Sequence, residues 1–174
     1  MAGKVRLKLD RSFREHAVQI LPAMLGKFLS FRDQIENGGR DTDRLHRMRI
    51  AGKPLRYMME ASQPAFGAEF ASCLREIEEA LSVMGTIHEC DVSIPVLVDF
   101  HEEMKILNAR VRDPKTDLQA KPVSNLVRLQ KRKRSKLLRD LKTMLARWER
   151  EDFPARLAKS MEQRASRPKR YRRP

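Results

Sequence analysis

The chain has 174 residues, which is enough for one hydrophobic core and short for two domains. Lysine and arginine total 37 against 23 acidic residues, for a formal net charge of +14, so a neutral or acidic protein is excluded. The two cysteines are too few for a disulfide framework, and no segment reaches the roughly 18 uninterrupted apolar residues of a membrane span.

The first predicted helix runs from Ser12 to Glu36, because apolar residues recur there at alternating steps of three and four. Asn37, Gly38 and Gly39 are predicted to end it. Asp41 or Asp43 can cap a second helix through Ser62, after which Pro64 and Gly67 break the chain.

A third helix is predicted over residues 69–108, with a kink at Pro95, and residues 109–122 are predicted to form a loop. The fourth helix is predicted over residues 124–150. Its expected core stripe comprises Leu126, Leu137, Leu141, Met144, Leu145 and Trp148.

Beyond the fourth helix, Pro154 permits one or two further helical turns through Arg164, and residues 165–174 form a basic tail expected to be disordered. Residues 10–164 thus predict one all-α domain, an antiparallel four-helix bundle with long, partly kinked helices. Cys73 and Cys90 are expected to be buried, reduced thiols.

Charge is distributed unevenly: residues 125–174 carry 18 basic and 5 acidic side chains, while residues 1–124 carry 19 and 18. A basic surface attracts polyanions such as nucleic acid, anionic membranes and phosphate polymers. The N-terminal MAGKVRLKLD lacks the apolar run of a signal peptide, so we expect a cytoplasmic protein.

The second predicted helix carries a row of bases at helical spacing. At 100° per residue, His46, Arg49, Lys53 and Arg56 fall within an arc of about 80°, beside a separate apolar face. Glu60 lies one turn beyond Arg56 and is expected to orient its guanidinium. A charged, solvated helix face is the simpler interpretation, but four like charges repel one another unless an anion binds.

The fourth helix repeats this pattern with six bases. Two cationic helix edges predict a groove for a linear chain of phosphates, because guanidinium groups bind phosphate oxygens bidentately and ammonium groups add charge. The bases on the fourth helix are Arg128, Lys131, Arg132, Lys136, Arg139 and Lys142.

Three motifs resemble the CHAD domain, the conserved histidine α-helical domain. LHRMRIAGKPLRYMME resembles its signature helix, with His46 in the position of the named histidine. LSVMGTIHECDVSI resembles a second motif, with Gly85, Asp91 and Val92 in register. A base-rich helix leading to a tryptophan resembles RLQKRKRSKLLRDLKTMLARW.

This resemblance implies an all-α fold that binds inorganic polyphosphate, without a cofactor, and an association with polyphosphate granules. Family members are commonly about twice as long, with two related halves, so this chain resembles a single half. A homodimer would rebuild the two-half arrangement. Pro54 replaces a base of the family pattern, and Glu89 stands where aspartate is expected.

Nucleic acid is the alternative partner, because the bases at 131–134 and the basic tail at 167–173 can bind any phosphate backbone. Few aromatic residues are left for base stacking. A metal-dependent phosphohydrolase is a weaker alternative, since Glu76, Glu78 and Glu79 are expected to be exposed and away from the basic row. No catalytic or metal-ligating set is apparent.

His88 and Asp91 share a helical face, but no third metal ligand converges on them locally. Asp91 can instead anchor an arginine of the basic row from a neighbouring helix. The sequence leaves open whether these two residues are structural or ligand-binding.

Overall fold

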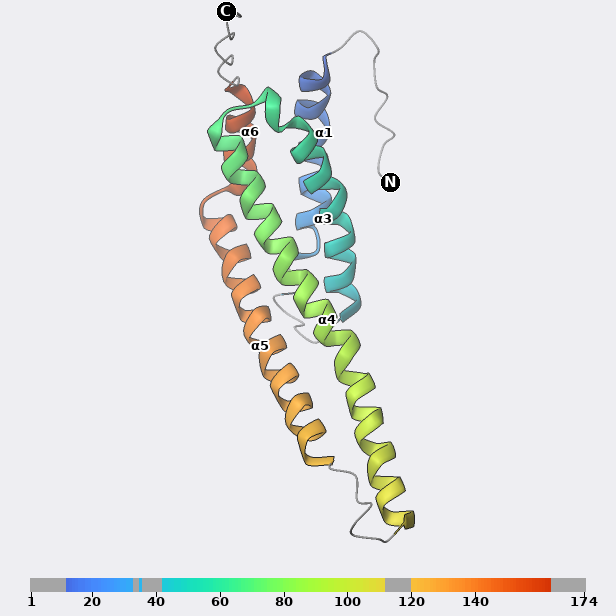
Figure 1. Cartoon of the computed structure of the whole chain (residues 1–174). Coiled ribbons are helices and arrows are strands. Elements are labelled where there is room, and N and C mark those ends of the chain that lie inside the picture. The colour runs from blue at the N-terminus through green and yellow to red at the C-terminus, as the bar shows by residue number, and fades with distance from the viewer. Residues whose placement is uncertain (1–11, 33–34, 36–41, 112–119, 164–174) are drawn as a thin grey trace, which may run out of the picture.

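A computed structural model describes residues 12–32, 35, 42–111 and 120–163 (Figure 1). In these ranges the chain is all-α, as predicted, and includes five α-helices. They are α1 (Phe13–Leu29), α3 (Thr42–Ser62), α4 (Ala68–Val111), α5 (Ala120–Arg150) and α6 (Phe153–Glu162), with a short 3-10 turn, η1, at Gln63–Ala65. The expected disordered tail and the predicted stop at residues 37–39 lie outside the described residues.

Helix α1 begins where the sequence predicts and ends earlier. Ser12 and Glu15 form a reciprocal capping box, in which the Glu15 carboxylate accepts from the Ser12 backbone N–H at 2.7 Å. At the other end Ser30 donates its hydroxyl to the Lys27 carbonyl at 2.8 Å. Such side-chain bonds compete with helix continuation, so α1 ends at Leu29 and the prediction of one helix to residue 36 was wrong.

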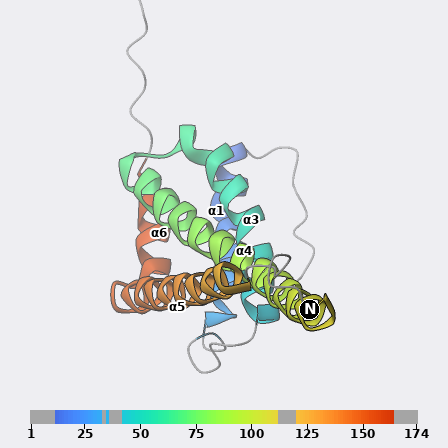
Figure 2. The same cartoon turned by 60° about the horizontal axis from the view of Figure 1, so that its bottom comes forward.

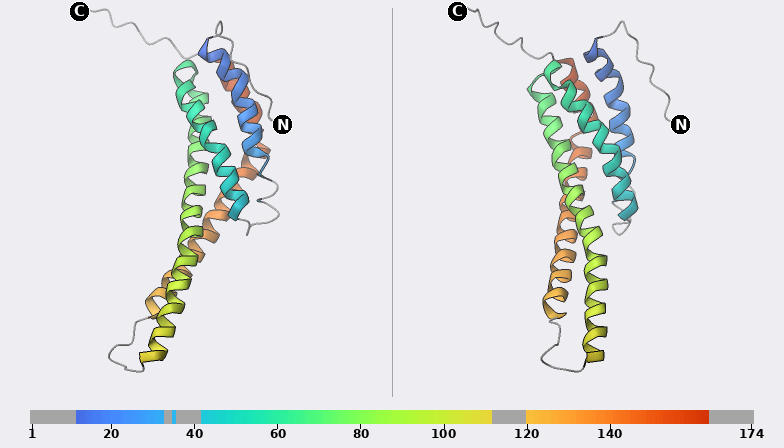
Figure 3. Two further views of the ribbon diagram at one scale, coloured as in Figure 1. Left: turned by 90° about the vertical axis from the view of Figure 1, so that its right-hand side faces the viewer. Right: turned by 45° about the vertical axis from the view of Figure 1, so that its right-hand side comes forward.

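Helices α3 and α4 confirm the second and third predicted helices despite a proline inside each. Pro54 and Pro95 are both exposed, so the carbonyls they leave unbonded lie on the solvent side. Figure 3 shows α4 continuing through its full length with gentle bending.

Helix α5 begins at Ala120, four residues before the predicted start, because Pro122 lies in its first turn, where a missing N–H costs little. The predicted loop at 109–122 is therefore helical at both ends. Leu141, Leu145 and Trp148 are buried as predicted, but Leu126 is exposed, which corrects that part of the core stripe.

The predicted four-helix antiparallel bundle is not confirmed, because the turns predicted after Pro154 form α6, which among the described residues is a fifth helix and contributes to the core. Asp152 adopts a left-handed conformation (φ 46°) and caps α6, which buries Phe153, Leu157 and Met161. The core lies among α1, α3, α6, the first half of α4 and the last part of α5. Beyond it, α4 and α5 continue as an antiparallel pair (Figures 1 and 3).

Glu76 of α4 links this helix to α5 and α6. The sequence predicted an exposed side chain, but Glu76 is half-buried. Its carboxylate accepts from the Trp148 indole N–H at 2.8 Å and from Arg147 and Arg156. Partial burial acts to lower the pKa of Arg156, but the hydrogen bond and charge of Glu76 outweigh it and raise that pKa. Burial raises the pKa of the nearby Cys73 thiol, and both cysteines are buried and free, as predicted.

Helix α4 also has the length and composition of a membrane-crossing helix. An 18-residue window within residues 68–110 has a mean hydropathy of 1.3, and 22% of it is buried inside the molecule. The window is not an uninterrupted apolar run, and apolar helices of soluble proteins meet the same criterion, so this is weak evidence for a membrane span.

Candidate functional site

The predicted basic row lies along one edge of α3 and is half-buried. His46, Arg49, Lys53 and Arg56 are all of intermediate exposure. The adjoining face of α3 is buried through residues that include Leu45, Met48, Leu55 and Met59. Helix α3 continues through Pro54 without a break, so all four bases lie on one helix.

Three of the four bases meet the surface of α4 in a pocket of about 480 Å³, which we call the α3–α4 pocket. The pocket is lined from α3 by Arg49, Lys53, Arg56 and Tyr57, and from α4 by Glu78, Leu81, Ser82, Gly85, Thr86 and Glu89. The Arg49 guanidinium lies on Gly85, where an added Cβ would be 3.6 Å from Nε. The family-motif glycine therefore forms the floor beneath a predicted binding residue.

Two contacts orient Arg56 in this pocket. Its Nε lies 3.1 Å from Glu60 Oε1, the contact that the one-turn spacing predicts, and its guanidinium lies 4.7 Å from the centre of the Tyr57 ring. The role of Glu60 in ligand binding stays a prediction. Tyr57 was missed as a site residue, because its position on the helix adjoins the basic row rather than belonging to it.

His46 lies at the end of the row that is nearer the α3 N-terminus, against His88 of α4. The two ring centres are 5.0 Å apart, and His46 Nδ1 is buried without a hydrogen-bond partner. Among the described residues, no group of three or more His, Cys, Asp or Glu side chains is placed to hold a metal ion.

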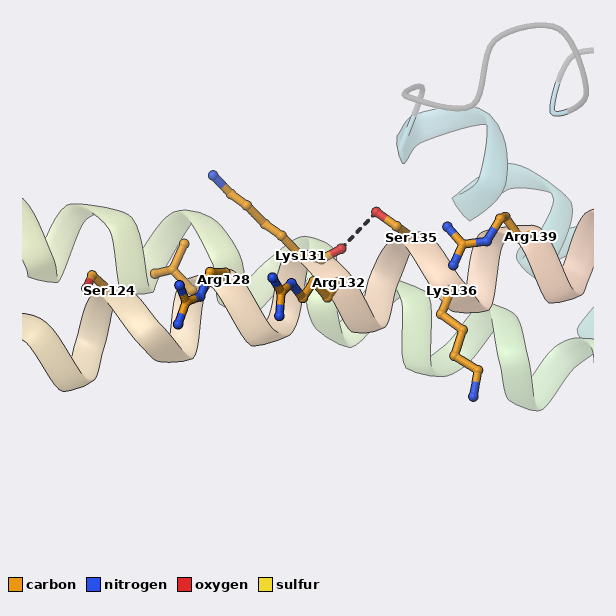
Figure 4. Close-up of a pocket in the computed structure, with 8 residues that line it drawn as sticks. Ser124, Arg128, Lys131, Arg132, Ser135, Lys136 and Arg139 are labelled. Carbon is orange, nitrogen blue, oxygen red and sulfur yellow. Dashed lines mark hydrogen bonds between the residues drawn. The ribbon is translucent and has the colours of Figure 1, made fainter.

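The second predicted row lies on α5 along an open groove of about 750 Å³, the α5 groove (Figure 4). Five of the six predicted bases line it: Arg128, Lys131, Arg132, Lys136 and Arg139. Figure 4 shows them spread along successive turns of one helix. Lys142 lies on the same helix and is half-buried, outside the described lining.

The described residues do not place the two rows as facing walls of one pocket. The two pockets share no described lining residue, and Figure 2 shows α3 and α5 on different sides of α4. The physical reason is that α3 packs on α1 and α4, whereas α5 packs mainly on α4, so each row borders a different surface.

Acidic side chains border the α3–α4 pocket, which the sequence did not predict. Glu78 was expected to lie away from the basic row, yet it lines the pocket together with Glu89. Asp91 does anchor an arginine of a neighbouring helix, but this is Arg134 of α5, which is outside the predicted binding set. Only the packing of α3 and α5 on α4 reveals these neighbours.

Comparison with known proteins gives one positive finding. The model of the CHAD domain family matches residues 2–98, more than half of the chain, and this range contains the first two motifs but not the base-rich helix α5. No curated protein and no solved structure gave a significant match. The match is consistent with a partial, single-half form, and the chain belongs to the CHAD domain family.

Proposed function

We propose that this protein binds inorganic polyphosphate, without catalysis, through the bases of the α3–α4 pocket and the α5 groove. The observation that carries the proposal is the α3 row, in which Arg49, Lys53 and Arg56 converge on one polar pocket while only half exposed. Partial burial weakens solvent screening, so an anion bound there interacts more strongly than on an open surface. The family is associated with polyphosphate binding, which agrees with this chemistry.

The α5 groove suits the rest of a linear polyanion. Its bases from Arg128 to Arg139 are spaced over eleven residues of helix, about 16 Å at the rise of an α-helix. Ser135 lies among these bases and Ser124 lies one turn before Arg128, and both hydroxyls donate to backbone carbonyls of α5. The groove offers charge and hydrogen-bond donors at regular steps and no shaped cavity, which favours a repeating chain over a compact ligand.

Nucleic acid is the second candidate, and Tyr57 is the observation that favours it. Tyr57 is 54% exposed and lies beside Arg56. An exposed aromatic ring next to a base is a surface on which an unstacked nucleotide base can stack. Trp148 is 1% exposed and cannot serve in this way.

A competition experiment at fixed salt separates the two candidates. We expect long-chain polyphosphate to displace labelled polyphosphate at a lower phosphate concentration than single-stranded RNA or duplex DNA. Preference for RNA that is lost in Tyr57→Ala would establish the alternative, and release of phosphate in the presence of Mg²⁺ would show an enzyme.

Paired substitutions locate the site. Arg49→Ala with Arg56→Ala should weaken polyphosphate binding by about 1.5–3 kcal/mol for each lost charged contact. Lys27→Ala with Lys105→Ala is the matched control, because it removes two exposed positive charges outside both pockets. Equal losses in the two folded variants, measured by titration calorimetry, would leave only a nonspecific effect of net charge and contradict the site.

A further inference from the structure

The part of the molecule beyond its core has almost no core of its own. We call residues 93–107 of α4 and 122–136 of α5 the distal hairpin. Among these residues, all of them described, Met104 is the one buried hydrophobic side chain. A pair of helices that share only one seam normally buries its remaining apolar surface against a further layer.

One face of the distal hairpin carries this uncovered apolar surface. On α4, Val96, Phe100 and Leu107 are 64%, 52% and 47% exposed, and at 100° per residue they fall within about 40° of arc. On α5, Leu126 and Leu129 are 41% and 59% exposed.

Both sets lie on the same side of the hairpin. On each helix of the pair, the exposed apolar residues are offset around the helix axis from the residues that face the other helix. The offset of Phe100 and Leu107 on α4 has the same rotational sense as the offset of Leu126 and Leu129 on α5. Because the helices are antiparallel, an equal sense of rotation places the two sets on one side. These five residues form what we call the apolar face.

The apolar face continues a surface that is already covered nearer the core. Four of the six α4 residues that line the α3–α4 pocket, Glu78, Ser82, Gly85 and Glu89, fall within an arc of about 60° that also includes Val96, Phe100 and Leu107. Helix α3 covers the part of this α4 surface that is nearer the core, and the covered part ends near the contact of His46 with His88. Figure 3 shows α4 and α5 extending beyond α3.

We propose that a second copy of this chain covers the apolar face, forming a two-fold homodimer through the distal hairpins. The exposed parts of the five side chains amount to roughly 400 Å² in each copy, and with the flanking residues two copies would bury about 1,200 Å², the lower end of specific interfaces. A two-fold axis lets the same face serve as both partners.

The charges at the edges of the face are complementary between two copies. Glu103 borders it on α4, and Lys133 and Lys136 border it on α5. A two-fold arrangement that sets α4 of one copy against α5 of its partner brings opposite charges together, whereas α4 against α4 brings like charges together. The dimer would also place the two α3–α4 pockets beside the interface, because each pocket adjoins the apolar face.

The test measures mass without any ligand, so its outcome is independent of polyphosphate binding. In sedimentation velocity at micromolar concentration we expect the whole chain to be a dimer and Val96→Glu with Leu129→Glu to have half that mass. The matched control is Ile106→Glu with Val18→Glu, which charges two exposed apolar positions elsewhere and should stay dimeric. Circular dichroism verifies that each variant is helical.

Exchanging the charges at the edges of the apolar face provides a second test of the dimer that does not depend on apolar residues. Glu103→Lys or Lys133→Glu alone should raise the dimer dissociation constant about tenfold, and the two together should restore most of the loss. A wild-type monomer overturns the proposal, as does an unchanged dimer in folded Val96→Glu with Leu129→Glu. If the monomer floats with neutral phosphatidylcholine vesicles and that variant does not, the occupant of the face is lipid and the dimer is likewise rejected.

Discussion

At the scale of single residues, the two described glycines at helix contacts have different roles. A Cβ at Gly85 would make ordinary contact with Arg49, so this glycine gives the guanidinium a surface to lie on. A Cβ at Gly52 would be 2.6 Å from Leu81 and 2.8 Å from Phe28. Gly52 therefore permits the close approach of α1, α3 and α4 that holds the basic row in place, although no family motif singled it out.

We predict that Gly52→Ala destabilises the fold. Overpacking of a close helix contact costs about 1–3 kcal/mol, which outweighs the gain in helix propensity. Chemical denaturation should show the loss, and Gly26→Ala is the control, because nothing lies within 4 Å of a Cβ there and the same propensity gain should stabilise α1. A stabilised Gly52→Ala variant would contradict the close approach.

At the scale of helices, hydrophobic periodicity determined where most elements form, and the two helices predicted to contain a proline do contain one. Helix α3 contains Pro54 and α4 contains Pro95 without a break, because both prolines are exposed. On α3, Pro54 lies on the side away from the basic row, since it is turned by about 100° or more from Lys53 and Arg56. The proline that replaces a family base thus removes a charge from a position outside the row.

We predict that Pro54→Ala stabilises the protein and leaves polyphosphate affinity unchanged. The variant restores an amide that can bond to the Ile50 carbonyl and removes the penalty of an interior proline, which is up to about 3 kcal/mol. Thermal unfolding followed by circular dichroism measures the first effect, and titration calorimetry measures the second. A change in affinity larger than twofold would show that the bend at Pro54 aligns the bases.

At the scale of the whole molecule, the excess positive charge is divided between two surfaces with different neighbours. The α5 groove is lined by bases without an acidic residue among its described lining. The α3–α4 pocket holds three bases and two acids, Glu78 and Glu89. We therefore expect the acids to oppose anion binding in the pocket and to restrict it to ligands that engage several bases at once.

We predict that Glu78→Gln with Glu89→Gln raises polyphosphate affinity about threefold to tenfold at moderate salt, as expected for removing two like charges near a bound anion. Glu69→Gln with Glu79→Gln is the control, because it makes the same change in net charge on exposed positions of α4 outside the pocket. Equal gains in the two variants would show that affinity follows net charge and not the pocket.

Most of the local structure was predictable from the sequence. Capping at Ser12, the periodic apolar residues of α3 and α4, and the end of α5 near Arg150 all follow from interactions within a few residues. The site was predictable as two sets of bases, because spacing along one helix fixes which side chains share an edge. The error at Leu126 arose because periodicity identifies an apolar stripe but cannot show what covers it.

The sequence by itself determined that the chain is helical, basic and bears the motifs of the CHAD domain family, since these depend on composition and on short-range spacing. Only the tertiary structure decided which surfaces the bases border. Helix α4 receives α3 and α5 on different sides, which puts Glu78 in the same pocket as Arg49 and separates the two basic rows. Such neighbours are set by packing between residues distant in the chain, and the spacing within one helix holds no information about them.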